Sequence, residues 1–175
     1  MKQPVASILF FICFAAFLSA WAGAEDLVCT AHRFTPDETC TPGAVLPFAL
    51  PAELCQPGYK QKNADIPEAL RKKVYDRYGV LYASKDYAPD YLVPPELGGV
   101  IDDRNLWPQP TKESPGFHEK NELEDFLYEA VCAGRMDLRA AQAKLTGDWV
   151  RAHDEMRSLK AIKKSATVYE IPPEF

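Results

Sequence analysis

The sequence predicts an α+β protein in which a small antiparallel hairpin lies among helices. Two short apolar runs, residues 91–93 and 105–107, are separated by the glycine pair Gly98-Gly99 and an acidic loop. Runs of this length that are split by glycine and closed by proline are typical of two strands folded back on each other. Apolar residues at helical spacing occur both before and after the hairpin, which adds helices to the prediction.

The segment before the hairpin is expected to form a helix that begins after Asp65. This residue can act as the N-cap, because its carboxylate accepts hydrogen bonds from the first free backbone N–H groups. Gly79 marks the C-terminal end, where glycine commonly adopts the left-handed conformation. Apolar residues recur along one face of this helix: Ile66, Leu70, Val74 and Tyr78.

Two further helices are expected after the hairpin. The first opens at Ser114-Pro115 and ends at Gly134, and the second begins at Asp137 and continues as one stripe to Met156. The apolar residues of the first are Phe117, Leu123, Phe126, Leu127, Ala130 and Val131. Those of the second are Leu138, Ala141, Leu145, Trp149, Ala152 and Met156. Stripes at this spacing indicate packing against a core and not a cofactor site.

The N-terminus has the pattern of a secretory signal peptide. Lys2 precedes an apolar run over residues 5–22, and Ala22-Gly23-Ala24 forms a small-x-small cleavage site ahead of two acidic residues. The alternative is an uncleaved anchor, because the run approaches the roughly 18 residues that a membrane span needs. The cleavage site favours removal of residues 1–24. We therefore expect a secreted or periplasmic protein with no stable membrane association after cleavage.

Removal of the signal peptide takes Cys13 with it and leaves four cysteines: Cys29, Cys40, Cys55 and Cys132. An even number in an exported chain indicates two disulfides, with three possible pairings. The spacing lacks the close Cys-x-x-Cys pairs of a zinc site. Residues 25–62, rich in proline, threonine and cysteine, are expected to form an extended arm tied by disulfides. A domain over residues 63–164 and a C-terminal tail over residues 165–175 follow.

The charge balance argues against binding of nucleic acid by bulk electrostatics. Among the charged residues only Lys2 leaves with the signal peptide, so the remaining chain has 19 basic and 25 acidic residues, a net charge of −6. This sign opposes the phosphate backbone. Basic clusters at residues 71–73 and 160–164 are most simply solvated helix faces. Arg104 and Lys120, beside the predicted hairpin, are the individual residues assigned to contact with nucleic acid.

The residues of the hairpin and of the helix after it carry a resemblance to a known family. They are 90–99 (DYLVPPELGG), 105–108 (NLWP) and 120–124 (KNELE), followed by VCAG at 131–134, AQ at 141–142 and DW at 148–149. Their order and spacing resemble the DHLIPLELGG…NLWP…KD…LE pattern of bacterial HNH-type endonuclease-like proteins. Upstream, the resemblance reaches Cys55, Pro57-Gly58 and Tyr78-Gly79, so that it covers roughly residues 40 to 152.

This resemblance implies a fold, a disulfide pairing and an activity. The fold would be a ββα-metal hairpin and helix embedded among helices, with a disulfide-tied N-terminal arm. Family members often carry only the equivalents of Cys55 and Cys132, which implies that these two pair and that Cys29 pairs with Cys40. The activity would be hydrolysis of DNA phosphodiesters with a divalent metal ion, either Mg²⁺, Mn²⁺ or Zn²⁺.

The resemblance also implies the site residues, position by position. Asp90 matches the aspartate that binds the metal. Asn105 matches the asparagine of the second strand, which orients the base or joins the metal. A residue of the helix would complete the site, and His118, Lys120 and Asn121 all lie near that place. We assign His118 to this role, because its nitrogen ligand suits several divalent ions.

The sequence departs from the family at the general base. Tyr91 stands where the family has histidine, and a phenol with an ordinary pKa near about 10 is a poor base at neutral pH. Cleavage of DNA is therefore expected to be weak or lost, with Tyr91, His118 and Asn105 as the candidate catalytic residues. The alternative is a catalytically inactive secreted protein that binds a partner on the same scaffold. In that case Asp90 bonds backbone amides and Asn105 holds the turn before Trp107.

Overall fold

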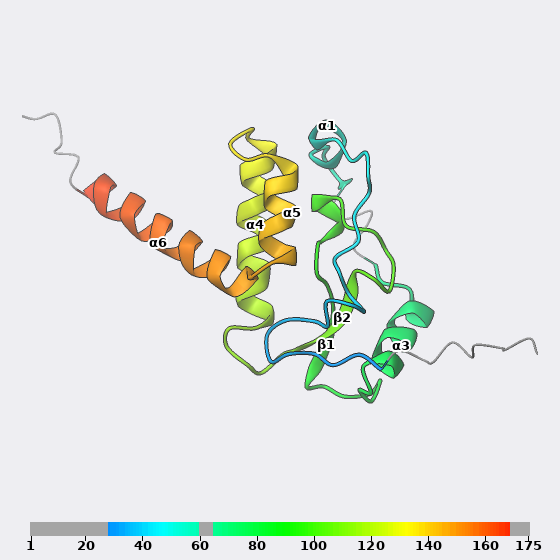
Figure 1. Cartoon of the computed structure of the whole chain (residues 1–175). Coiled ribbons are helices and arrows are strands. Elements are labelled where there is room, and N and C mark those ends of the chain that lie inside the picture. Colours follow the sequence, from blue (N-terminus) through cyan, green and yellow to red (C-terminus); the bar gives the residue numbers. More distant parts are fainter. Residues whose placement is uncertain (1–27, 60–64, 169–175) are drawn as a thin grey trace, which may run out of the picture.

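The computed structural model describes residues 28–59 and 65–168 of the 175-residue chain. A two-stranded antiparallel sheet lies among helices (Figure 1), which confirms the predicted α+β class. In chain order the elements are α1 (Pro51–Leu54), α3 (Glu68–Arg77), β1 (Tyr87–Tyr91), the 3₁₀ helix η1 (Pro95–Leu97), β2 (Leu106–Pro110), α4 (Phe117–Cys132), α5 (Leu138–Thr146) and α6 (Trp149–Val168).

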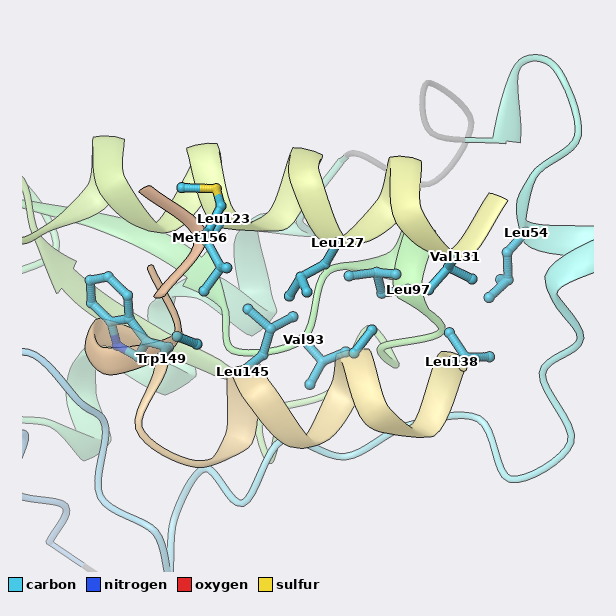
Figure 2. Packing of buried hydrophobic residues seen from close by; sticks show 12 residues of the cluster. Leu54, Val93, Leu97, Leu123, Leu127, Val131, Leu138, Leu145, Trp149 and Met156 are labelled. Carbon is cyan, nitrogen blue, oxygen red and sulfur yellow. The ribbon is translucent and has the colours of Figure 1, made fainter. Parts of the chain in front are cut away.

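The main core lies between α4, α5 and the start of α6. Leu123, Leu127 and Val131 project from α4 toward Leu138 and Leu145 of α5 (Figure 2). These positions recur every three or four residues, so that each helix turns one apolar face inward. The other large members come from α1, from the segment after β1 and from α6: Leu54, Val93, Leu97, Trp149 and Met156.

A smaller core lies on the other side of the hairpin, against α3. The predicted apolar face of this helix is confirmed, since Val74 is buried there and its neighbours on that face pack around it. Tyr91 of β1 and Leu106 of β2 supply the buried contacts from the sheet. The hairpin is therefore held from both faces, by α3 on one and by α4 on the other.

The first strand begins earlier than predicted. β1 ends at Tyr91, where the predicted strand starts, and its register places Asp90 opposite Trp107. The sequence of residues 87–91 does not have the pattern of a strand, because Pro89 and Asp90 are residues that strands disfavour. Pro108, the expected end of the second strand, lies inside β2, because each strand of a two-stranded sheet keeps a free edge that tolerates proline.

Two helix boundaries also differ from the prediction. α3 begins at Glu68 and not directly after Asp65, because Pro67 occupies the N-cap position and proline disfavours helical geometry in the residue before it. The single helix predicted from Asp137 to Met156 consists of α5 and α6, with a break at Gly147-Asp148.

That break has a capping explanation. The Asp137 cap of α5 is confirmed, since its carboxylate accepts a hydrogen bond from Arg139 N at 2.8 Å. Asp148 provides a second cap, because its carboxylate accepts from Arg151 N at 3.0 Å. The continuous apolar stripe concealed this second start, since the inward face of α6 follows that of α5 without interruption.

Both disulfides implied by the resemblance are present. Cys29–Cys40 spans 11 residues of sequence within the arm, and Cys55–Cys132 spans 77 residues, from the end of α1 to the last residue of α4. The arm also contacts the loop of the hairpin through an isolated bridge between Val45 and Gly99. The predicted signal peptide and residues 169–175 of the predicted tail lie outside the described residues. Within residues 28–59 and 65–168, none of the helices has the length and apolar character that a membrane crossing needs.

Replacement of Cys55 and Cys132 by serine is expected to lower the free energy of unfolding by about 2–4 kcal/mol, measured by urea unfolding. The double replacement of Cys29 and Cys40 is expected to have a smaller effect, because a shorter loop restricts the unfolded chain less. Equal losses in the two double variants would contradict this explanation by loop length.

Candidate functional site

The candidate site lies where the end of β1 meets the N-terminal half of α4. Asp90 and Tyr91 are adjacent in β1, so their side chains point to opposite faces of the sheet. Asp90 faces α4, where it contacts Lys120, and Tyr91 faces α3. The two residues expected to share one catalytic site therefore have separate surroundings.

A fully buried lysine lies at the centre of the Asp90 side. The Nζ atom of Lys120 is 2.7 Å from Asp90 Oδ2 and donates a hydrogen bond to the carbonyl oxygen of Tyr91 at 2.6 Å. It also donates to Oε1 of Glu124, one turn further along α4. The ammonium group thus lies among three oxygen atoms, in two hydrogen bonds and one ion pair. Lys120 thus fixes the end of β1 to α4, and we refer to Asp90, Lys120 and Glu124 as the ion cluster.

Burial is the main influence on the pKa values of the ion cluster, which contains two acidic groups and one basic group. Burial raises the pKa of Glu124 to about 8; the Lys120 charge opposes this shift, whereas Asp90 and Glu96 reinforce it. Burial also raises the pKa of Asp90 against the opposing effect of Lys120. Burial acts to lower the pKa of Lys120, but the attraction of Asp90 and Glu124 outweighs it and raises that pKa. The cluster therefore retains a proton on a carboxyl group at neutral pH.

Tyr91 belongs to the apolar core beside α3. Its ring packs with Val74 and Leu106, and its buried hydroxyl has no hydrogen-bond partner within the part of the chain that the structure describes. Burial, with a further contribution from the Asp65 charge, raises the pKa of Tyr91 to about 12. At neutral pH the phenol therefore loses its proton even less often than a free tyrosine does, so it is less available as a general base.

Asn105 is fully buried and holds the backbone of the loop between the strands. Its Oδ1 accepts a hydrogen bond from Val93 N at 2.9 Å. Its Nδ2 donates to Val93 O at 2.8 Å and to Val100 O at 3.0 Å. The amide of Asn105 therefore joins the backbone of Val93 to that of Val100, in the loop that leads to β2.

The remaining predicted site residues lie on the surface or point elsewhere. His118 is exposed, since two residues along a helix correspond to about 200° of rotation and Lys120 occupies the inward face. The His118 ring contacts Phe117, with 5.8 Å between ring centroids. Arg104 is exposed and its Nε is 3.0 Å from Asp102 Oδ1. Lys120, also assigned to nucleic acid, is buried and so is not accessible to a phosphate in this conformation.

Across residues 28–59 and 65–168, no three His, Cys, Asp or Glu side chains converge as a metal site. Asp90 and Glu124 are the carboxylates that a cation at the end of β1 would use. The ammonium of Lys120 contacts both of them. Asp90 and Glu124 therefore supply the negative charge that balances one cation, and that cation is the ammonium group of Lys120.

Glu124 is the site residue that the sequence analysis missed. The spacing of residues in the sequence indicates that Glu124 is buried, because Lys120 and Glu124 fall on the same face of α4 as Leu123 and Leu127. Opposite charges four residues apart on an apolar face indicate a buried ion pair. The third member, Asp90, comes from another element, and helical spacing does not reveal it.

Comparison of the chain with protein-family models, with curated proteins and with solved structures found no match. The functional proposal therefore rests on the geometry of the ion cluster and its surroundings.

Proposed function

We propose that this chain is an exported protein built on an HNH-like hairpin and helix, and that it acts by binding and not by hydrolysis. The observation that carries this proposal is the buried ammonium of Lys120 in contact with both Asp90 and Glu124. A metal-dependent nuclease needs carboxylate oxygens that are accessible to a divalent ion. In this chain those oxygens neutralise an internal cation.

The order of the elements supports the scaffold part of the proposal. β1, a loop, β2 and α4 follow one another as the ββα-metal arrangement requires. Asp90 lies near the end of β1, Asn105 directly precedes β2, and Lys120 comes from α4. Asp90 and Asn105, the two positions matched individually to the family, both form contacts within the protein: Asp90 with Lys120, and Asn105 with the backbone of Val93.

The state of the possible bases supports the loss of hydrolysis. Activation of water at neutral pH needs a group whose pKa lies near that pH and that reaches the reacting atoms. The pKa of Tyr91 is raised to about 12, and its hydroxyl lies among apolar side chains. His118 is exposed on a different face of α4 from Lys120.

An exposed apolar stripe in the arm supports the binding part. Leu46, Phe48 and Leu50 lie along a segment that turns at Pro47-Phe48, and they are 41 %, 89 % and 54 % exposed. The backbone of the segment is fixed, because Leu46 N donates to Gly98 O at 2.8 Å and Arg139 Nη2 donates to Pro47 O at 2.6 Å. Fixed apolar side chains on a surface are typical of a contact site for another protein.

The proposal is tested with the oxidised protein, supercoiled plasmid DNA and Mg²⁺, Mn²⁺ or Zn²⁺. We expect no nicking above that of the Asp90→Asn variant, and a change in melting temperature of less than about 1 °C with each metal, because no binding free energy is added to the folded state. Tyr91→His is also expected to remain inactive, since the side chain at position 91 faces α3 and not the ion cluster.

Two outcomes would overturn the proposal. Metal-dependent nicking that Asp90→Asn abolishes would restore the hydrolytic interpretation. Loss of that nicking in His118→Ala would then identify His118 as the base. Circular dichroism of each variant separates loss of activity from loss of folding.

A further inference from the structure

A cavity of about 330 Å³ lies between the N-terminal arm and the junction of α5 with α6. The arm is held against this junction, since Trp149 Nε1 donates a hydrogen bond to the carbonyl oxygen of Phe34 at 2.7 Å. Gly43 of the arm lies so close to the end of α5 that a Cβ atom there would be 2.4 Å from Thr146 Cγ2. The cavity therefore has fixed walls, and its volume is that of a site for a small ligand.

The backbone of the cavity walls has few hydrogen-bond donors to offer a ligand. The N–H groups of Thr35, Thr41 and Gly147 donate to backbone carbonyl oxygens of the protein at 2.6, 2.7 and 3.1 Å. Pro36 and Pro42, which also line the cavity, have no N–H group. A ligand therefore meets mainly hydrogen-bond acceptors in this backbone.

Two hydroxyl groups of the walls are also arranged as acceptors. Thr146 Oγ1 donates its proton to the carbonyl oxygen of Gln142 at 3.2 Å, and Thr41 Oγ1 donates to the carbonyl oxygen of Leu106 at 3.2 Å. A hydroxyl has one proton, so each oxygen can only accept a hydrogen bond from a ligand. The hydroxyl of Thr41 also contacts that of Tyr78 at 2.8 Å, which leaves Thr146 as the more available of the two.

The charge at the cavity is negative. Glu38 lines it, and among residues 28–59 and 65–168 no basic side chain pairs with this carboxylate. Because α5 ends at Thr146, the negative partial charge of its C-terminus also lies at the cavity. The N-terminus of α6 does not cancel this charge, since the carboxylate of Asp148 caps it and accepts a hydrogen bond from Arg151 N at 3.0 Å.

We propose that this cavity binds an alkylammonium group, which belongs either to a free amine or to a lysine side chain of another protein. An ammonium donates three hydrogen bonds and accepts none, as acceptor-rich walls require. Its charge would lie beside Glu38 and the hydroxyl of Thr146, and its alkyl chain against Leu92 and Pro36, which are buried.

The same walls fit a metal ion less well. Ca²⁺ needs six to eight oxygen ligands, and Mg²⁺ needs six in octahedral geometry. Glu38 is the carboxylate among the lining residues, and within the described parts of the chain no three His, Cys, Asp or Glu side chains converge. The cavity contains no residue of the ion cluster, so this inference does not depend on whether the hairpin hydrolyses DNA.

The proposal is tested by titration of the oxidised, isotope-labelled protein with n-butylamine at neutral pH, followed through its backbone amide signals by NMR. We expect the largest shifts at Thr35, Glu38 and Gly147, which line the cavity. n-Butanol has the same chain length without the charge, so it is expected to leave these signals unchanged.

The contribution of charge has a matched pair of variants. Glu38→Gln is expected to weaken the binding of butylamine about three- to fivefold, because an ion pair open to solvent contributes about that much. Glu53→Gln removes the same charge from an exposed position in α1 and should bind like the unmodified protein. Circular dichroism of both variants confirms that they are folded.

A blocked tripeptide with lysine at its centre distinguishes the two sources of the ammonium group. Binding as tight as that of butylamine would assign the cavity to a lysine side chain of a partner, and binding of butylamine alone would assign it to a free amine. Equal shifts with n-butanol, or equal losses in Glu38→Gln and Glu53→Gln, would overturn the proposal. The same shifts produced by Ca²⁺ at a lower concentration would replace the ammonium group by a metal ion.

Discussion

Lys120→Met is expected to lower the free energy of unfolding by about 3–5 kcal/mol at neutral pH, because it leaves two acidic groups buried without their cation. Methionine keeps most of the length and the apolar stem of lysine, so the packing of α4 changes little. The loss therefore reports on the ammonium group and its contacts with Asp90, Glu124 and the carbonyl of Tyr91. Urea unfolding monitored by circular dichroism measures it.

The chain offers a matched control on α3. The Nζ atom of Lys72 is 2.8 Å from Asp76 Oδ2, but both side chains are about 60 % exposed. Lys72→Met is therefore expected to change stability by less than about 0.5 kcal/mol. Addition of Asp90→Asn and Glu124→Gln to Lys120→Met should recover most of the loss, since no buried charge then remains. If Lys120→Met proved as mild as Lys72→Met, Lys120 would not be what holds β1 to α4.

Stability is expected to decrease as the pH rises from about 5 to about 8, because Glu124 binds its proton more tightly in the folded state. The pKa of Glu124 is raised by burial from 4.5 to about 8. Between these values the folded protein keeps a proton that the unfolded chain has released. Each pH unit in this window therefore lowers the free energy of unfolding by about 1.4 kcal/mol, which adds up to about 4 kcal/mol over three units.

A carboxyl group whose pKa is lowered in the folded state has the opposite effect on stability, and this effect is seen at low pH. The Thr30 backbone N–H and the Thr39 hydroxyl lower the pKa of Asp37 to about 2. Its contribution is present above the ordinary pKa of aspartate and is lost as the pH falls toward about 2. Glu124→Gln is expected to flatten the decrease above pH 5 and to leave this acid limb unchanged. An unaltered slope in Glu124→Gln would show that another group causes the alkaline decrease.

Local patterns in the sequence were sufficient for the helical core. The spacing of Leu123, Leu127 and Val131 predicted which face of α4 is buried, because a helix repeats its face every three or four residues. The cap at Asp137 was visible for the same reason, since capping depends on the residue itself and on its nearest neighbours along the chain. The resemblance supplied the pairing of Cys55 with Cys132, which spacing alone did not decide.

The candidate site was harder to predict from the sequence, because its geometry depends on how the two strands of the hairpin pair. A strand changes the face of each side chain at every residue, so an error in where β1 lies also obscures which side chains share a face. The resemblance implies that Tyr91 and Asp90 share one site, whereas the strand directs their side chains to opposite faces of the sheet. The contact between Asp90 and Lys120 joins residues 30 positions apart, and no periodicity within one element records it.

The bridge between Cys55 and Cys132 also closes the chain into a covalent ring that contains α3, the hairpin and α4. A protease that cuts within this ring, for example at the exposed turn around Leu81, would leave two pieces still joined through sulfur. The cut ends would stay near each other, since both pieces keep their contacts with the rest of the ring. Exposed loops between residues 55 and 132 are therefore places where this protein can tolerate cleavage without dissociation.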